Sequence, residues 1–270
     1  NYSPSQYGFL KQDYEQDIKR LYKEINDFNP NIIITMGGLG LWALTNIDKI
    51  GSYRGALTYS NVGNLHRPYK IMPTYSPFAV LKNYSFRPTV VSDLKKAVQE
   101  STTKDIENTE REIYIEPTYE EVVQFFKECR EENSEDNPLS FDIETASGEI
   151  TCIGFAPSPK RSMVVPFRDI TKKSQAFYDY TTEITIWKEI ASLLQDEKIT
   201  KVAQNQTYDV SWLSYKYGID VAGTVHDTMH AQHSLQPEME KGLGFLGSIY
   251  TNEGAWKNLT SFSKSTKAEE

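Results

Sequence analysis

Two carboxylates stand close together in the segment Phe141–Thr145, whose sequence is Phe-Asp-Ile-Glu-Thr. In a β-strand, residues two apart point to the same face, so Asp142 and Glu144 project together while Phe141 and Ile143 face the other side. Neighbouring carboxylates without a basic partner repel each other, and a divalent cation between them relieves that repulsion. The pair therefore predicts a divalent-metal site or, in the simpler interpretation, two exposed acids at the end of a strand.

A second group of polar residues lies in the segment Ala203–Asp209. The pattern predicts the end of a strand followed by the first turn of a helix. Asn205 then lies at the strand end, and Asp209 follows four residues later on the helix, near the edge of the sheet. An acidic side chain near a helix N-terminus is also favoured by the helix dipole, so this segment has a purely structural explanation as well.

The first of three sequence blocks, residues 1–99, alternates predicted helices and strands, which is typical of an α/β layer architecture. The second block, residues 100–109, is polar, lacks an apolar period and is predicted to be a linker. In the first block the expected helices cover residues 9–28, 39–45 and 92–99, the strands cover 31–36 and 70–75, and turns lie at Gly37-Gly38 and Ser76-Pro77.

The third block, residues 110–270, predicts a mixed sheet flanked by helices. A capping box, Thr118-x-x-Glu121, marks the start of its first helix, and Gly218 and Asp227 mark a later helix end and helix start. Turn residues separate three successive strands, which predicts an antiparallel meander. The expected strands cover 113–115, 138–145, 149–156, 162–167 and 199–203, and the later helices cover 186–194, 207–217, 228–235 and 242–250.

The composition bounds the class of protein. The chain has 270 residues, which suggests about two domains, and its 39% hydrophobic and 24% charged residues are typical of a soluble globular protein. No apolar run approaches the ~18 residues that span a bilayer, and the start has no features of a signal peptide. The first residue is not Met, so we expect a piece of a longer protein. The two cysteines, Cys129 and Cys152, are expected to be inert thiols in a reducing compartment.

The net charge of −8 does not exclude nucleic acid as a partner. The stretch Glu100–Asn137 holds thirteen acidic and four basic residues, so it accounts for −9 and the rest of the chain sums to about +1. Nucleases that use divalent metals also need an acidic site, where the bound ion reverses the local charge.

The two polar segments together resemble the 3′–5′ proofreading exonuclease domain of family A DNA polymerases, of the bacteriophage type, within the DEDD superfamily. Asp142-Ile143-Glu144 matches the Asp-x-Glu element of that family, and the segment Asn205–Asp209 matches its Asn-x-x-Tyr-Asp element. Val225–Met229 and Leu243–Tyr250 resemble the segments that follow. The resemblance covers residues 110–270, in the expected order.

This resemblance implies a ribonuclease-H-like fold with a mixed five-stranded sheet, and phosphodiester hydrolysis by two Mg²⁺ or Mn²⁺ ions. By motif, Asp142 would contact both ions, Glu144 the ion that activates water, and Asp209 the second ion. The expected substrate is a single-stranded DNA 3′ end, and the expected product is a nucleoside monophosphate. The expected partner is a polymerase domain of the same longer protein, and no membrane is expected to be involved. The expected location is the cytoplasm, which is that of the host cell if the protein is viral. The residues expected to bind substrate are Asn205, Thr145 and Tyr208.

One element of the superfamily is missing. Its third motif is Tyr-x-x-x-Asp or His-x-x-x-Asp, and no Tyr or His after Asp209 is followed by Asp at the fourth position. In the family this motif lies further on, so we expect it past Glu270. The chain then holds three of the four carboxylates that bind metal in the family. One expected outcome is that the isolated chain binds metal weakly and is inactive.

The first block has a resemblance of its own, to the second half of uracil-DNA glycosylases, over about residues 9–99. The strand that ends in Met36-Gly37-Gly38 and the segment Thr74–Asn83 match best. Ser76 occupies a position that is usually His in active members, and a neutral hydroxyl is a poorer stabiliser of a departing anion. The resemblance implies a partial, inactive glycosylase-like domain. The alternative is a generic α/β domain with an ordinary Ser-Pro turn.

Three functions remain open at this stage. The first is the N-terminal part of a phage-type family A DNA polymerase that carries the proofreading exonuclease, the second is an RNA-processing exonuclease of the same superfamily, and the third is a non-catalytic DNA-binding or scaffold module. A zinc site on His226, His230 and His233 is a weaker hypothesis than a capped helix with exposed histidines. Asp227, at the start of the same predicted helix, is predicted to be its cap and not a metal ligand.

Overall fold

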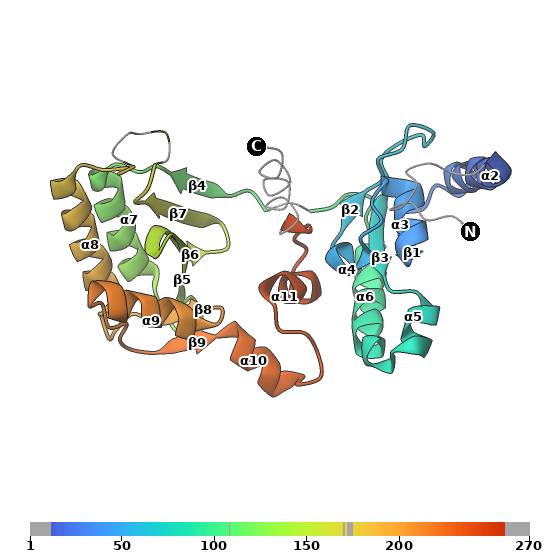
Figure 1. Ribbon diagram of the computed structural model, residues 1–270. Coiled ribbons are helices and arrows are strands. Elements are labelled where there is room, and N and C mark those ends of the chain that lie inside the picture. The colour runs from blue at the N-terminus through green and yellow to red at the C-terminus, as the bar shows by residue number, and fades with distance from the viewer. Residues whose placement is uncertain (1–11, 108, 170, 172–174, 257–270) are drawn as a thin grey trace. The chain divides into compact units, whose positions relative to one another are not determined.

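The computed structural model describes residues 12–107, 109–169, 171 and 175–256 and divides the chain into two compact units (Figure 1). Unit 1 is formed by residues 1–108 and 236–270, and unit 2 is formed by residues 109–235. Within the described ranges, no helix combines the length and the apolar composition that crossing a membrane requires.

A mixed sheet forms the centre of unit 2, with the strand order β4-β7-β6-β5-β8-β9. Strands β5, β6 and β7 form the predicted antiparallel meander, whereas β4 pairs in parallel with β7 and β8 pairs in parallel with β5 and β9. The expectation of five strands is wrong, because β9, which is not among the expected strands, adds a sixth at the edge of the sheet. The strands are β4 (Glu112–Ile115), β5 (Leu139–Ala146), β6 (Glu149–Ser158), β7 (Arg161–Pro166), β8 (Lys201–Ala203) and β9 (Val225–Asp227).

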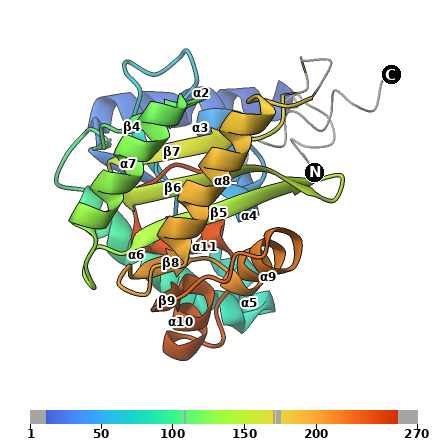
Figure 2. The same ribbon diagram turned by 90° about the vertical axis from the view of Figure 1, so that its left-hand side faces the viewer.

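Two helices, α7 (Tyr119–Glu132) and α8 (Tyr180–Leu194), lie side by side across one face of this sheet (Figure 2). The predicted capping box starts α7: the Thr118 hydroxyl accepts from the backbone of Glu121, whose carboxylate accepts from the backbone of Thr118. Inward residues of α7, α8 and the strands form one buried apolar cluster. Phe141 and Ile143 of β5 belong to that cluster, as their alternation predicts.

The rest of unit 2 consists of α9 (Gln206–Tyr217), which follows β8, and α10 (Thr228–Leu235), which follows β9. Helix α9 ends at Gly218 in the left-handed conformation, as predicted. Leu213 of α9 is fully buried. Tyr208, on the first turn of α9, is about half exposed.

Unit 1 is a three-layer structure around a smaller sheet, in which β3 (Lys70–Thr74) lies between β1 (Ile32–Met36) and β2 (Thr58–Tyr59). Strand β3 is buried on both faces. Its Ile71 packs with residues of α2 and α3, and its Met72 packs with Ala97 of α6. The helices are α2 (Gln12–Phe28), α3 (Gly38–Thr45), α4 (Ile50–Tyr53) and α6 (Arg87–Glu100). Residues 9–11 of the first predicted helix lie outside the described residues.

The Ser76-Pro77 turn predicted from the sequence is the start of a helix, α5 (Pro77–Lys82), which is followed by a short 3-10 helix, η1 (Tyr84–Phe86). Ser76 is the N-cap of α5, and its hydroxyl accepts from the backbone N–H of Ala79. Proline at the first helical position is compatible with a helix because that N–H has no partner inside the helix.

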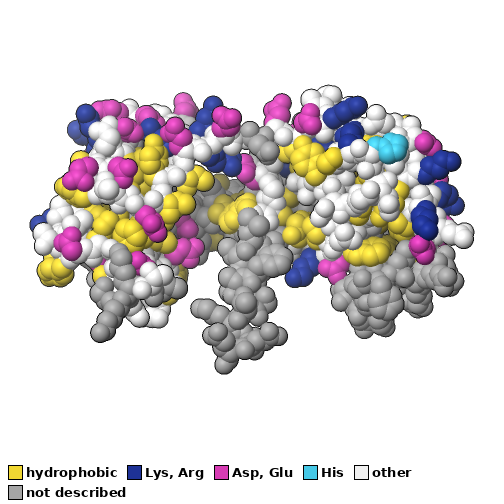
Figure 3. Space-filling model, turned by 90° about the horizontal axis from the view of Figure 1, so that it is seen from above, with side chains coloured by type: hydrophobic (Ala, Val, Ile, Leu, Met, Phe, Trp, Pro, Cys, Tyr) yellow, Lys and Arg dark blue, Asp and Glu magenta, His cyan; other side chains and the backbone are white. Residues whose placement is uncertain are grey.

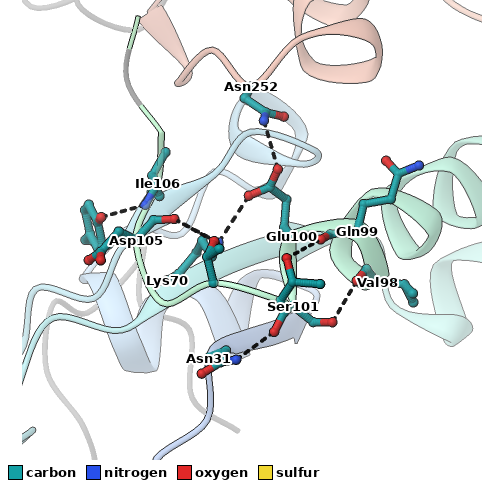
Figure 4. Close-up of polar contacts among 12 residues, drawn as sticks. Asn31, Lys70, Val98, Gln99, Glu100, Ser101, Asp105, Ile106 and Asn252 are labelled. Atoms are coloured by element: carbon teal, nitrogen blue, oxygen red, sulfur yellow. Dashed lines mark hydrogen bonds and ion pairs between the residues drawn. The ribbon is translucent and has the colours of Figure 1, made fainter.

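The segment 100–109, predicted to be a linker, is held on unit 1 over much of its length (Figure 4). The buried Lys70 ammonium donates to the Glu100 carboxylate, the Thr103 hydroxyl and the backbone oxygen of Asp105. Asn31 donates to the backbone oxygen of Ser101. These contacts hold residues 100–106 on unit 1.

The compact units also differ from the predicted domains at the C-terminal side. The predicted exonuclease domain ended at residue 270, whereas residues 236–256, with α11 (Leu243–Tyr250), pack within unit 1. A buried polar cluster holds α11 there. Arg54 donates to the Asp93 carboxylate (2.9 Å) and the Ser248 hydroxyl (2.8 Å), and Lys96 donates to the backbone oxygens of Ser248 and Thr251.

Gly55 makes this cluster possible. Its φ of +72° is unfavourable for residues with a side chain. A Cβ atom at this position would also lie 2.7 Å from Asp93 Oδ1 and 3.2 Å from the backbone oxygen of Ser248. The backbone can therefore approach the buried ion pair only because residue 55 lacks a side chain.

Charge is unevenly distributed on the face seen from above in Figure 3. Basic side chains are visible over the part of unit 1 that holds α2, a helix whose sequence has three basic and five acidic residues. Acidic side chains are spread over unit 2, in agreement with the acidic stretch 100–137, which includes all of α7. The surface therefore carries both signs of charge despite the negative total.

Asp93→Ala is expected to lower the free energy of unfolding of the protein by about 3–5 kcal/mol, because it leaves the buried Arg54 guanidinium without its carboxylate. Glu24→Ala is the matched control, since it breaks the exposed Arg20–Glu24 pair of α2 and is expected to cost less than about 1 kcal/mol. Urea unfolding measures both values. Equal losses would contradict the structural importance of this cluster.

Candidate active site

The carboxylates of β5 project from the sheet face opposite to α7 and α8. Asp142 and Glu144 are exposed, while their neighbours Phe141 and Ile143 are buried. The residue paired with Asp142 on β6 is Gly154, which has no side chain and leaves space on the same face. The strand pairing shifts directly after Glu144, a type of irregularity that is often found beside active sites. The predicted projection of both carboxylates from one strand is confirmed.

Asp209 reaches these carboxylates because β8 is short. Strand β8 pairs with β5 only at residues 139 and 140, so the backbone N–H of Ile143 lies beyond the end of the ladder. The Asp209 carboxylate of α9 accepts a hydrogen bond from this N–H at 2.9 Å. Asp209 is only 3% exposed, and it is anchored to the residue that separates Asp142 from Glu144.

The environment of Asp209 is unfavourable to its negative charge. Burial raises the pKa of Asp209 to about 6, and repulsion from Asp142 and Glu144 acts in the same direction. The hydrogen bond from Ile143 opposes this shift but does not cancel it. The three carboxylates therefore interact electrostatically, and a cation would relieve the repulsion among them.

Two of the residues predicted to bind substrate contact each other beside this group. The Thr145 hydroxyl, at the end of β5, and the Tyr208 hydroxyl, on the first turn of α9, are 2.6 Å apart and share a hydrogen bond. Tyr208 is 46% exposed, so part of its ring is accessible. This contact fixes the first turn of α9 to the strand that carries Asp142 and Glu144.

Asn205, the third predicted substrate residue, lies at the N-terminus of α9 in the left-handed conformation (φ 58°, ψ 47°). Asn205 is exposed, and its backbone N–H donates to the Asp227 carboxylate. The sequence predicted Asp227 as a cap of α10, which is confirmed by bonds from the N–H groups of Met229 and His230. Its second role at Asn205 was not foreseen. The parallel pairing of Ala203 with Asp227 places Asp227 beside the end of β8, and no local sequence signal indicates this pairing.

The residue types at this site suit a hard divalent cation, because carboxylate oxygens are the ligands that Mg²⁺ prefers. Within the described part of the chain, no group of three or more His, Cys, Asp or Glu side chains is arranged so that it could hold a metal ion, and this applies to the three carboxylates as well as to the three histidines. Burial raises the pKa of both thiols, that of Cys129 to about 12, in agreement with inert cysteines.

Asp209→Asn is expected to stabilise the metal-free protein at neutral pH. The pKa of Asp209 is about 6 when folded and close to 3.9 when unfolded, so stability falls as pH rises from about 4 to 6 and stays lowered above. Asn keeps an oxygen for the Ile143 N–H but carries no charge. In EDTA at pH 8 the variant should gain about 2–3 kcal/mol, and the gain should vanish near pH 4.

Thermal and urea unfolding across this pH range measure the difference between the variant and the wild type. Asp136→Asn, at an exposed position, is the control and should show no pH-dependent gain. A difference for Asp209→Asn that is independent of pH would refute the assignment of a raised pKa to Asp209.

The chain is similar to a DNA polymerase of Bacillus phage SP01, with 24% identity over 241 residues. The match covers 80% of this chain and 25% of the phage protein, so the chain spans about a quarter of the length of this relative. Because 80% of the chain exceeds the length of unit 2, the match extends into unit 1.

The chain has low similarity to several solved structures. The EXD2 exonuclease domain soaked in Mg and GMP is 18% identical, with a TM-score of 0.34 over 51% of this chain and 67% of that chain. The Nibbler EXO domain of Aedes aegypti is 10% identical, with a TM-score of 0.39 over 53% and 69%. The catalytic core of RRP6 from Trypanosoma brucei is 14% identical, with a TM-score of 0.39 over 54% and 38%.

The sequence model of one family matches residues 113–266, which is more than half of the chain. Its description is 3′–5′ exonuclease. The matched span contains Asp142, Glu144 and Asp209, together with the Thr145–Tyr208 contact and the turn at Asn205. The chain belongs to this 3′–5′ exonuclease family.

Proposed function

We propose that the protein removes 3′-terminal nucleotides from single-stranded DNA, as the proofreading exonuclease of a family A DNA polymerase that uses Mg²⁺ or Mn²⁺. The observation that carries this proposal is the hydrogen bond of Asp209 to Ile143. It fixes a third carboxylate at the strand that bears Asp142 and Glu144.

In this proposal Asp142, Glu144 and Asp209 hold the ions. When bound, the ions lower the pKa of an attacking water and stabilise the entering and leaving oxygens of the phosphodiester. Asp142 and Glu144 are exposed and can meet ions that arrive with the substrate, whereas the buried Asp209 is fixed from behind by the backbone. A site with one rigid and two accessible carboxylates is suited to ions that exchange with each turnover.

The substrate residues of the proposal surround this group. The half-exposed Tyr208 ring offers a stacking surface for a terminal base, and its hydroxyl is oriented by Thr145. Asn205 adds an exposed amide at the start of the same helix. Because Tyr208 and Asn205 belong to the first turn of α9, the element that presents the base also carries Asp209.

The choice of DNA over RNA is supported by the similarity to the phage SP01 DNA polymerase, which extends beyond unit 2. An RNA-processing exonuclease is the alternative, and it predicts the opposite substrate preference. A direct comparison of matched DNA and RNA oligonucleotides distinguishes the two.

Wild-type protein is expected to shorten a 5′-labelled single-stranded DNA oligonucleotide stepwise from its 3′ end, in the presence of Mg²⁺ or Mn²⁺ and not in EDTA. Asp142→Asn should lower the rate at least about 100-fold, because several kcal/mol of transition-state stabilisation depend on the bound ions. The measurement is a time course resolved by gel electrophoresis, with the full natural polypeptide.

Asp136→Asn serves as the control and should leave the rate unchanged, because this carboxylate is exposed and lies outside the site. Preferential digestion of RNA would transfer the assignment to the alternative. If neither substrate is digested in a metal-dependent way, the proposed activity is refuted. The non-catalytic module is then the remaining alternative.

For unit 1 we propose a non-catalytic nucleic-acid-binding role, in line with a partial glycosylase-like domain. Residues 49–92 contain no Asp or Glu but six Lys or Arg, of which Arg54 and Lys70 are buried in ion pairs and the other four remain for the surface. Within this stretch, Leu81 is 83% and Tyr84 is 70% exposed. Basic groups lie over aromatic rings beside them: the Lys82 ammonium over Phe78 at 4.5 Å and the Arg87 guanidinium over Tyr84 at 5.9 Å.

The position of Ser76 agrees with a role without glycosylase chemistry. Its hydroxyl is engaged as the N-cap of α5. Exposed aromatic rings next to basic groups are the features with which proteins bind single strands without sequence preference. The role proposed for unit 1 is therefore to hold a strand.

The double variant Lys82→Glu/Arg87→Glu is expected to weaken binding of a single-stranded oligonucleotide. The slope of log K against log salt should fall by about 0.7 for each phosphate that the variant no longer neutralises. Lys19→Glu/Arg20→Glu on α2 is the matched control, since these residues already face acidic partners. Fluorescence anisotropy over a salt series, in EDTA, measures both. Equal weakening by the two double variants would contradict a specific surface on unit 1.

A further inference from the structure

The Asp227 carboxylate joins the starts of two helices. It lies at the end of β9, and its side chain is 2% exposed. It accepts from the backbone N–H of Asn205 (3.2 Å) and Gln206 (2.9 Å) at the start of α9. It also accepts from Met229 (2.8 Å) and His230 (3.3 Å) at the start of α10. Burial alone would raise the pKa of Asp227, but these four bonds outweigh it and lower the pKa.

The turn at Asn205 depends on an outside partner. Asparagine adopts the left-handed conformation more readily than most residues, but that conformation is still less favourable than the right-handed one, so hydrogen bonds from its surroundings help to hold the turn. Asn205 makes no side-chain capping hydrogen bond to α9. The capping of α9 comes instead from Asp227, more than twenty residues later in the chain.

The oxygens of Asp227 are therefore already used within the protein. Oδ1 accepts from three N–H groups and Oδ2 accepts from Gln206, with the His230 imidazole 3.7 Å from Oδ2. This carboxylate differs from Asp142 and Glu144, which face the open side of the sheet. Its chemistry is that of a positioning group and not of a metal ligand.

We propose that Asp227 is a positioning residue of the exonuclease site: it imposes the turn at Asn205 and thereby sets where α9 places Tyr208 and Asp209. The inference rests on the proposed function for its catalytic consequence, but the positioning itself has a separate readout. Asp209 protects the Ile143 N–H from solvent. If Asp227 sets the position of α9, its loss must reach this amide, which lies on a different strand.

A graded pair of variants tests the proposal. Asp227→Asn keeps one carbonyl oxygen as an acceptor, whereas Asp227→Ala keeps none. Hydrogen–deuterium exchange should accelerate at the amides of residues 205 and 206 and at Ile143, more in Asp227→Ala than in Asp227→Asn. The rate of 3′ digestion should fall in the same order, by about 10-fold and about 100-fold, because an error of about 1 Å in placing a reacting group has an effect of that size.

Asp179→Ala is the matched control for a general loss of stability. Asp179 is also a carboxylate N-cap, of α8, and it accepts from the backbone of Thr181 and Thr182. Asp179→Ala should therefore lower the melting temperature without changing exchange at Ile143 or the digestion rate. All measurements are made well below the lowest melting temperature of the set.

The outcomes separate the two proposals. Unchanged exchange at residues 205, 206 and 143 in Asp227→Ala would overturn the inference, as would accelerated exchange with an unaltered digestion rate, or equal effects in Asp179→Ala. If the wild type does not digest DNA or RNA, the proposed function fails. The exchange at Ile143 then decides alone whether Asp227 positions α9.

Discussion

The arrangement of the site depends on one unpaired position in a sheet. A buried backbone N–H must find an acceptor, because leaving it without one costs about as much as a lost hydrogen bond. At Ile143 the neighbouring strand β8 has already ended, and the acceptor is the Asp209 side chain. One satisfied amide therefore fixes the position of a helix relative to a strand and brings together acidic residues that are more than sixty positions apart.

This arrangement is unfavourable in electrostatic terms without a cation. The raised pKa of Asp209 reflects burial and repulsion from Asp142 and Glu144, while packing on the other face of β5 keeps the strand in place. The apolar cluster under Phe141 and Ile143 therefore stabilises a site that opposes folding at neutral pH. Natural proteins accept such local conflicts mainly where a function requires them.

The sequence predicted most of unit 2, because its signals are local. Alternation along β5, the capping box of α7 and the glycine after α9 each lie within a few residues of the element that they define. The pair Asp142 and Glu144 follows from the two-residue period of a strand. The start of α5 was a local signal as well, since serine followed by proline also marks a helix start, but it was interpreted as a turn.

What could not be predicted depends on distant partners. The length of β8, and with it the anchoring of Asp209, is set by sheet pairing and not by the residues of β8 alone. The second role of Asp227 requires the pairing of β8 with β9. The location of α11 requires Arg54 and Lys96, which are polar, buried and about 150 residues or more away in sequence, so no apolar period announces them.

The inclusion of α11 in unit 1 has a consequence for the order of folding. Unit 2 is an uninterrupted stretch of chain, whereas unit 1 is built from two stretches on either side of it. During synthesis from the N-terminus, unit 2 has all of its residues before the second stretch of unit 1 exists. Until then Arg54 and Lys96 lack the hydroxyl and backbone acceptors of Ser248 and Thr251, so the buried polar cluster of unit 1 is complete only after these residues have been synthesised.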